Sequence, residues 1–184
     1  MFIQTEITPN PNAIKFLTRT VISQEQPIHF DNIDEAKEVS PLATQLFNLD
    51  SVKTVFFGSD FITVTKHEGN DWDVLKTEIL VTIMDYIVAG LPILENQYID
   101  PSKVSNVNMN EIEKQIIEII ESRVRPSVAM DGGDIIYRGF ENGIVKLELR
   151  GSCLGCPSST ITLKDGIESM LKHFVPEVES VEAI

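Results

Sequence analysis

The hydrophobic pattern in the first half of the chain begins with two short extended stretches. Residues 2–7 alternate, with Ile3, Thr5 and Ile7 on one side, and residues 14–17 form a second apolar run. Between them lies the Pro-Asn-Pro-Asn sequence at 9–12, a combination typical of turns. The pattern therefore predicts two strands joined by a turn.

A helix and a hairpin are predicted next. Ser40 and Pro41 are suited to the N-cap and the first position of a helix, and the apolar residues Leu42, Leu46 and Phe47 follow at helical spacing. Residues 52–57 and 61–65 are apolar runs on either side of Gly-Ser-Asp at 58–60. Because these turn residues separate two strand-like runs, we expect a β-hairpin.

The longest periodic segment of this half predicts an amphipathic helix. Asn70 is a candidate N-cap, and Gly90 and Pro92 are expected to end the helix. Its buried face is predicted to contain residues spaced three or four apart, namely Trp72, Leu75, Ile79, Ile83 and Ile87.

The second half begins with another predicted helix. Asn110 and Glu113 have the spacing of a capping box, and we expect the helix to end near Arg125-Pro126. A turn is expected at 131–134, which reads Asp-Gly-Gly-Asp. The stripe predicted to be buried is Ile112, Ile116, Ile119 and Ile120.

A hairpin, a helix and a last strand complete the predicted elements. Residues 135–140 and 144–150 flank an Asn-Gly turn, and Val145, Leu147 and Leu149 alternate with charged residues. A helix is expected after the segment 151–160, and a short strand at 178–183. The inner face of that helix is predicted to contain Leu163, Ile167, Met170, Leu171 and Phe174.

These elements indicate an α+β protein with two small domains. Each is expected to be α/β-sandwich-like, a short sheet packed by helices. The hydrophobic pattern disappears between about residues 91 and 109, where Pro, Asn, Ser and Asp accumulate. We therefore expect a first domain at 1–90, a linker at 91–109 and a second domain at 110–184, each domain folding independently.

Composition and charge narrow the possible functions. Of 184 residues, 42% are hydrophobic and 23% charged, an ordinary globular balance, but the net charge is −13. An anionic chain repels nucleic acids and anionic lipids, and the apolar run at 79–84 is too short to span a bilayer. The N-terminal residues lack the features of signal and transit peptides, so we expect a cytosol-like compartment.

The candidate chemistry lies at two cysteines, Cys153 and Cys156, which are the two that the chain contains. Their Cys-x-x-Cys spacing at a strand-to-helix junction allows both sulfurs to face one metal centre. Gly155 permits a tight turn, and Pro157 is suited to the first position of the following helix, whose N-terminus would stabilise thiolates. We expect both cysteines on an exposed loop of the metal-free protein.

A purely structural, buried cysteine pair would need neither Gly155 nor Pro157 and is not favoured. The spacing leaves three kinds of chemistry open. A dithiol–disulfide redox protein would use the same two cysteines, although a thioredoxin-like unit would place a βαβ element before them. A zinc-bridged interaction module and an iron–sulfur protein both generally need four ligands. Since one chain offers two cysteines, both metal alternatives need a second chain, which a two-fold dimer would supply.

A family resemblance separates these alternatives. Residues 110–184 resemble the NifU-like C-terminal domain of Nfu iron–sulfur scaffold proteins, through Arg125-Pro126, the 131–134 sequence and Gly-Ser-Cys-Leu-Gly-Cys-Pro-Ser-Ser at 151–159. The sequence Thr-Pro-Asn-Pro-Asn-Ala-Ile-Lys-Phe at 8–16 resembles the opening of the Nfu N-terminal domain.

The resemblance implies a cluster carrier. It implies a [4Fe–4S] cluster bridged between two subunits of a homodimer, with Cys153 and Cys156 as its ligands. Upstream cluster-assembly proteins would supply the cluster, and apo iron–sulfur proteins would receive it. The compartment would be the bacterial cytoplasm, or the mitochondrial matrix for a processed eukaryotic form.

The remaining candidates are interpreted structurally. The 131–134 sequence could line the approach to a cluster or a partner surface, but its glycine pair is interpreted as backbone geometry. Trp72 is interpreted as core, and His29, His67 and His173 as surface or core residues. With no set of residues that forms a known catalytic motif, we expect no enzymatic activity and no catalytic residue. The first domain contains no candidate ligand, so we expect it to dock partners or to orient the second domain.

Overall fold

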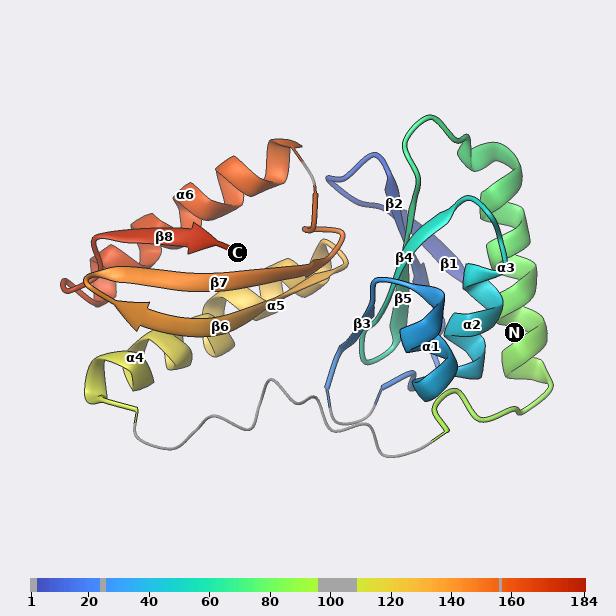
Figure 1. The fold of residues 1–184 in the computed structure, drawn as a ribbon, viewed down its shortest axis with the longest axis horizontal. Coiled ribbons are helices and arrows are strands. Elements are labelled where there is room, and N and C mark those ends of the chain that lie inside the picture. The colour runs from blue at the N-terminus through green and yellow to red at the C-terminus, as the bar shows by residue number, and fades with distance from the viewer. Residues whose placement is uncertain (1–2, 24–25, 96–108, 156) are drawn as a thin grey trace.

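The computed structural model describes residues 3–23, 26–95, 109–155 and 157–184, and the linker residues 96–108 and Cys156 lie outside this part. The chain is an α+β protein with two domains (Figure 1). The first contains an antiparallel sheet and the second a mixed sheet. The expected fold class is therefore confirmed. Within the described residues, no helix is both long and apolar enough to cross a membrane.

The first domain is built on a five-stranded antiparallel sheet with the order β1-β2-β5-β4-β3. The predicted hairpin is confirmed, with Val55 of one strand opposite Val64 of the other. Ile7, expected to share a face with Ile3, is instead 93% exposed, because it ends an edge strand. The strands are β1 (Gln4–Ile7), β2 (Ala13–Leu17), β3 (Ile28–Phe30), β4 (Val52–Phe57) and β5 (Phe61–Lys66).

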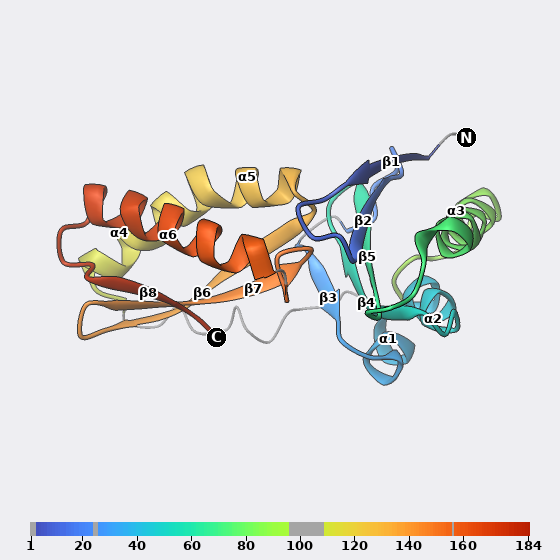
Figure 2. The same ribbon diagram turned by 90° about the horizontal axis from the view of Figure 1, so that it is seen from above.

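Three helices, α1 (Ile33–Val39), α2 (Pro41–Phe47) and α3 (Trp72–Val88), cover one face of this sheet (Figure 2). Ser40 caps α2 as predicted, since its hydroxyl accepts a hydrogen bond from the N–H of Ala43. The N-cap of α3 is Asp71 and not Asn70, because the Asp71 side chain accepts from the N–H of Asp73. The core between sheet and helices includes Phe16, Phe30, Phe57, Ile62, Ile79 and Ile83.

The sequence pattern missed β3 and α1. Strand β3 has three residues, and α1 buries Ala36 as its one fully buried residue, so neither presents a periodic apolar stripe. The local signal for α1 is its N-cap, Asn32, whose side chain accepts hydrogen bonds from the N–H groups of Asp34 and Glu35.

The second domain begins with helix α4 (Glu111–Ile119), and its capping box between Asn110 and Glu113 is present as predicted. The expected end near Arg125-Pro126 is wrong. The helical path continues through a π-helical turn, η2 (Ile120–Val124), into α5 (Arg125–Met130). Pro126 lies in the first turn of α5, where a missing N–H costs little, so it redirects the helical path without ending it.

The sheet of this domain has the order β6-β7-β8. Its strands are β6 (Gly133–Glu141), β7 (Ile144–Gly151) and β8 (Ser180–Ala183). Strand β7 is antiparallel to β6 and parallel to β8. Helices α4, α5 and α6 (Pro157–Phe174) pack on one face (Figure 2). Val145, Leu147 and Leu149 point into that core as predicted. Phe174, expected inside, is 43% exposed and its ring lies under the Arg123 guanidinium instead.

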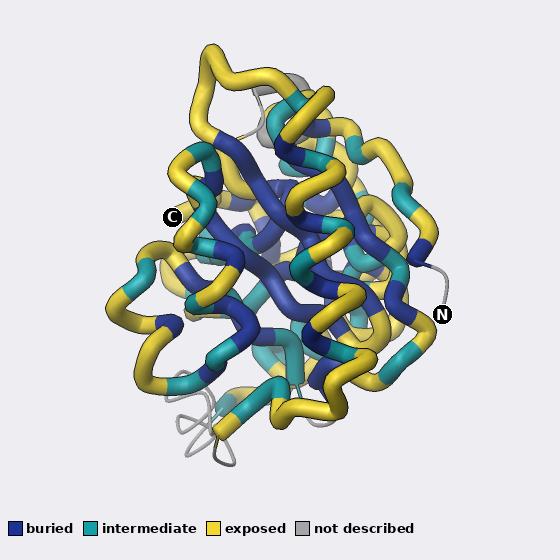
Figure 3. Tube along the Cα trace, turned by 90° about the vertical axis from the view of Figure 1, so that its right-hand side faces the viewer, coloured by how far each residue is buried: buried dark blue, intermediate teal, exposed yellow. Residues whose placement is uncertain are grey.

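The second face of the first domain's sheet is covered by the second domain. Strand β5 is buried along its whole length, so the strands are dark blue in the burial view while the outer helices carry exposed residues (Figure 3). On this second face Phe56, Thr63 and Lys15 are 1%, 1% and 7% exposed. The two expected domains therefore meet through a buried interface.

Candidate metal centre

Cys153 lies in a tight turn directly after β7. Gly151, the last residue of that strand, has a φ of +66°, which favours glycine. The turn is closed by the N–H of Leu154, which donates to the carbonyl of Gly151 at 3.2 Å. A Cβ at Gly151 would lie 2.6 Å from the carbonyl oxygen of Gly132. Glycine at 151 therefore serves both the turn and the close approach of a second loop.

The expectation that Cys153 is exposed is wrong. Its residue exposure is 4%, and it packs within the core of the second domain. Its sulfur lies 3.9 Å from the hydroxyl oxygen of Ser152, and Leu154 beside it is 40% exposed. Cys156 lies outside the described residues. We call residues 151–154 the cysteine turn. Its Cys153 side chain packs against the protein, whereas its Leu154 side chain is exposed to solvent.

The Asp-Gly-Gly-Asp sequence at 131–134 packs against the cysteine turn and accepts hydrogen bonds from it. The hydroxyl of Ser152 donates to the carbonyl of Asp131 at 2.5 Å, and the N–H of Ser152 donates to the carbonyl of Gly132 at 3.2 Å. A Cβ at Gly133 would lie 2.6 Å from the sulfur of Cys153. The glycine pair was interpreted as backbone geometry, and the structure shows what that geometry serves, which is close contact with the cysteine turn.

A buried ion pair fixes the strand that leaves this loop. Asp134 is 4% exposed, and both its carboxylate oxygens accept hydrogen bonds from the Arg125 guanidinium at 2.8 Å. Arg125 also donates to Glu121 at 2.9 Å. The hydrogen bonds with Asp134 raise the pKa of Arg125 above its ordinary value. Arg125 and Asp134, noted in the sequence as parts of motifs, therefore join α5 to β6.

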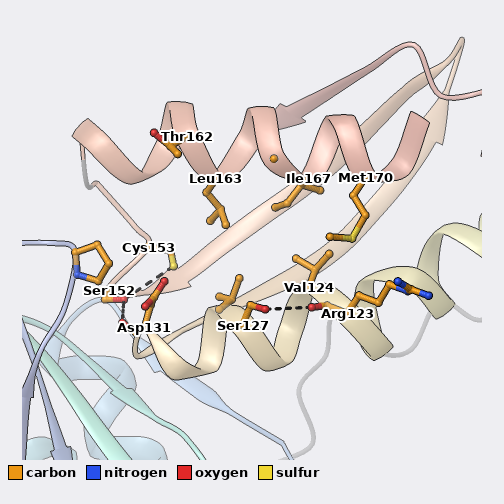
Figure 4. Close-up of a pocket in the computed structure, with 13 residues that line it drawn as sticks. Arg123, Val124, Ser127, Asp131, Ser152, Cys153, Thr162, Leu163, Ile167 and Met170 are labelled. Atoms are coloured by element: carbon orange, nitrogen blue, oxygen red, sulfur yellow. Dashed lines mark hydrogen bonds between the residues drawn. The ribbon is translucent and has the colours of Figure 1, made fainter. Parts of the chain in front are cut away.

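An apolar groove of about 510 Å³ begins at the cysteine turn and runs between α5 and α6. Cys153 lies at one end of it, and Leu163, Ile167 and Met170 project into it from α6 (Figure 4). Asp131 and Ser152 supply polar atoms at the cysteine end. The site therefore combines a thiol with a largely apolar approach.

Helix α6 begins at Pro157, as the sequence predicted. Cys153 lies four positions before this first helical residue. The N-terminus of a helix carries partial positive charge and unpaired N–H groups, which favour anionic sulfur. The arrangement suits thiolate ligands and negatively charged sulfide clusters.

No other metal-binding cluster accompanies the cysteine turn in the described residues, which contain no group of three or more His, Cys, Asp or Glu side chains. His29 lies 3.1 Å from Asp31, and this hydrogen bond lowers the pKa of the Asp31 carboxyl. The ring of His173 stacks edge-on against Phe174. Trp72 packs partly buried against the first domain's core, as expected.

Sequence reasoning missed the residues of the first domain that contact the site. The turn between β1 and β2 reaches the cysteine turn, where the Asn10 side chain donates to the carbonyl of Ser152 at 3.0 Å. Lys15 donates to the carbonyl of Met130 at 3.0 Å, and Thr63 donates to the carbonyl of Gly132 at 2.8 Å. The Pro-Asn-Pro-Asn pattern indicated a turn, but no local signal indicates what a turn contacts in another domain.

Comparison with known proteins identifies both domains. Residues 3–90 match the family model described as scaffold protein Nfu/NifU N terminal, and residues 116–182 match the NifU-like domain. The solution structure of a NifU-like protein from Saccharomyces cerevisiae is 29% identical, with a TM-score of 0.47, over 53% of this chain and 87% of that one.

Two relatives that match along the whole of this chain agree with these domains. The chain is 49% identical to the human protein named NFU1 iron-sulfur cluster scaffold homolog, mitochondrial, over 100% of this chain and 72% of that protein. It is 45% identical to the protein of the same name from Drosophila ananassae, over 100% of this chain and 64% of that protein.

Fold and comparisons together define a two-domain protein that joins an Nfu N-terminal domain to a NifU-like domain. The chain belongs to the Nfu family of iron–sulfur cluster scaffold homologues.

Proposed function

We propose that this protein is a non-enzymatic iron–sulfur carrier, which holds a [4Fe–4S] cluster between two copies of the chain and transfers it to apo-proteins. The observation that carries the proposal is the position of Cys153. Its thiol lies at the end of an apolar groove and shortly before the N-terminus of α6, in a chain 49% identical to a cluster scaffold homologue.

Cys153 and Cys156 are the proposed ligands. Thiolates are soft ligands suited to iron–sulfur clusters, and a [4Fe–4S] cluster usually takes four of them. Since the chain contains two cysteines, two copies related by a two-fold axis supply the four thiolates. The groove and the start of α6 would limit water and favour the anionic cluster.

Transfer to recipients follows from the shared site. A cluster bound by two thiolates from each copy is less enclosed than one held by four cysteines of a single chain. Cysteines of an apo iron–sulfur protein can then replace the carrier's ligands one at a time. Upstream assembly proteins supply the cluster, and the carrier makes and breaks no covalent bond of an organic substrate.

The compartment follows from the names of the relatives. The human and fly relatives are both named mitochondrial. Of the two compartments that the sequence suggests, we infer that the mitochondrial matrix is favoured over a bacterial cytoplasm.

Anaerobic reconstitution tests the proposal. The purified chain is incubated with ferrous iron, sulfide and a thiol reductant, then desalted and measured by native mass spectrometry and iron and sulfide analysis. We expect a dimer with about two iron atoms per chain, half of one four-iron cluster. Dilution should favour cluster loss, because binding and dimerisation are coupled by mass action.

Three other results would contradict the proposal. A stable monomer that retains a full four-iron cluster without added thiol would exclude the bridged site. Stoichiometric zinc without iron would instead support the zinc-bridged module, and turnover of disulfide substrates by the metal-free monomer would support the dithiol–disulfide redox protein.

A further inference from the structure

The turn between β1 and β2 is the part of the first domain that contacts the cysteine turn. Asn10, at the tip of this turn, is 2% exposed although its side chain is polar. Its Nδ2 lies 3.0 Å from the carbonyl oxygen of Ser152 and 3.4 Å from that of Leu154. One amide group therefore donates to the residues immediately before and after Cys153.

The orientation of this amide is determined by its own domain. The Oδ1 of Asn10 accepts a hydrogen bond from the N–H of Asn12 at 3.0 Å. The backbone N–H of Asn10 donates to the hydroxyl of Thr8, and its carbonyl accepts from the N–H of Ala13. Because Oδ1 faces an N–H group, Nδ2 is the atom that faces the two carbonyls, and the donor is held in place before the domains meet.

The cysteine turn is anchored from two sides. Its own domain holds it through Ser152, whose N–H donates to the carbonyl of Gly132 and whose hydroxyl donates to that of Asp131. Asn10 binds the opposite groups, the carbonyls of Ser152 and Leu154. The peptide before Cys153 is restrained through the Ser152 carbonyl, and the peptide after it is restrained through the Leu154 N–H, which donates to Gly151. The backbone of Cys153, which sets the origin of its side chain, is therefore held on both sides.

We propose that Asn10 is a positioning residue for Cys153, through which the first domain holds the cysteine turn in the conformation that binds the cluster. The inference rests on the proposed function and adds a specific task for the first domain. A ligand that is already oriented loses less conformational entropy on binding, so the cluster is held longer when Asn10 is engaged.

Asn10→Asp is the most informative substitution. It keeps the size of the side chain and an oxygen that can accept from the N–H of Asn12, but it replaces the donor with an oxygen facing two carbonyls. Asn10→Ala removes the donor without adding charge, and it tests the same inference if the Asn10→Asp variant does not fold.

Lys15→Met is the matched control. Lys15 also crosses to the second domain, but its Nζ donates to the carbonyl of Met130, beside the loop that holds Ser152, and not to the cysteine turn itself. The control therefore weakens the contact between domains and leaves both hydrogen bonds from Asn10 in place. It separates the effect of weaker contact between the two domains from the effect of losing the hydrogen bonds of Asn10 beside Cys153.

The first measurement uses the metal-free protein. In a Cys156→Ser background, the alkylation rate of Cys153 by iodoacetamide is followed from pH 6 to pH 10. We expect Asn10→Asp to raise the rate at least about fivefold, the factor for loss of one ordinary hydrogen bond, because it removes both bonds to the cysteine turn, and to shift the midpoint of its pH profile. Lys15→Met should change neither quantity by more than about twofold.

The second measurement uses the reconstituted protein with both cysteines present. Cluster loss to an iron chelator is followed by visible absorbance, and it should be about fivefold faster in Asn10→Asp than in the unsubstituted chain. Asn10→Ala should act in the same direction. The unfolding midpoint of each variant is measured in parallel to establish that it is folded.

The possible outcomes are distinct. If Asn10→Asp and Asn10→Ala fold but leave both rates unchanged, or if Lys15→Met raises them equally, the positioning role is wrong although the proposed function stands. If the unsubstituted chain takes up no cluster, the proposed function fails. In that case a specific change in alkylation would still support control of the cysteine turn by Asn10.

Discussion

Gly133 and Cys153 approach so closely that no larger residue fits at position 133. A Cβ built on Gly133 would lie 2.6 Å from the cysteine sulfur and 2.8 Å from the carbonyl oxygen of Arg150. The two residues are 20 positions apart in the sequence, and they meet where β6 begins and β7 has just ended. The glycine thereby determines how near the sulfur can lie to the sheet.

Gly133→Ala should therefore displace Cys153. Backbone and sulfur must both shift to admit the methyl group, so we expect the free energy of unfolding to fall by about 1–3 kcal/mol. Cluster uptake should fall further than stability alone explains, since the proposed ligand moves. Chemical denaturation and iron analysis of the same sample measure the two effects.

Gly166→Ala is the matched control. Gly166 is one of the residues of α6 that line the groove, and a Cβ added there would have no neighbour within 4 Å. Alanine favours the helix by about 1 kcal/mol over glycine, so stability should rise and cluster uptake should remain. Unchanged stability and uptake in Gly133→Ala would show that the close contact has no consequence.

Cys153→Ser should prevent cluster assembly while the chain remains folded. The substitution replaces a buried thiol by a more polar hydroxyl and should lower stability by about 1–3 kcal/mol, less than the stability of a typical domain. Circular dichroism reports folding, and anaerobic iron and sulfide analysis reports assembly. A normal complement of cluster in this variant would contradict the ligand assignment.

The two domains should fold when separated. Each has its own core, so the fragments 1–95 and 107–184 should both unfold cooperatively, and the second alone should bind the cluster. Separation exposes Phe56 and Thr63, which are buried in the whole chain. The first fragment should therefore be less stable than in the whole chain. Thermal unfolding of each fragment and of their mixture measures this, and an unfolded second fragment would disprove the predicted boundary.

Breaking the Arg125–Asp134 pair should be costly. Arg125→Met leaves a buried carboxylate without its partner, and the free energy of unfolding should fall by about 3 kcal/mol. Asp134→Asn together with Arg125→Met removes both charges and should recover part of that loss. Denaturant unfolding of both proteins measures the difference. Equal losses in the single and double variants would show that burial of an unpaired charge is not the cause.

Acid should destabilise the second domain partly through Glu148. Burial acts to raise the pKa of this carboxyl, but hydrogen bonds from Arg150 and Arg138 outweigh it, so its pKa lies below its ordinary value of 4.5. The folded state binds this proton more weakly than the unfolded state, so the stabilisation is present above pH 4.5 and is lost as the pH falls below it.

Glu148→Gln should flatten that dependence. Its free energy of unfolding should decrease less between pH 5 and pH 3 than that of the unsubstituted chain, as urea titrations at each pH would show. Glu141→Gln serves as the control, because the Glu141–Lys146 pair is exposed and contributes little. Parallel curves for Glu148→Gln and the unsubstituted chain would rule out this contribution.

Local signals predicted many of the elements. The capping box at Asn110, the Ser40 cap and the two hairpins each depend on neighbouring residues, and all are present. The errors have physical causes. The sequence predicts a helix end at Pro126 because proline usually stops a helix, and the π-turn that precedes it leaves no local signal. Helix α1 lacks a hydrophobic pattern because it buries little apolar surface.

The sequence by itself determined the α+β class, the family and the position of the Cys-x-x-Cys motif. These depend on residue types, spacing and short-range hydrogen bonds, which the chain order displays directly. The burial of Cys153, the need for glycine at 133 and the contact with Asn10 were decided by the tertiary structure alone. Asn10 and Ser152 are 142 positions apart, and only the packing of two domains brings an amide donor to the carbonyls beside a cysteine.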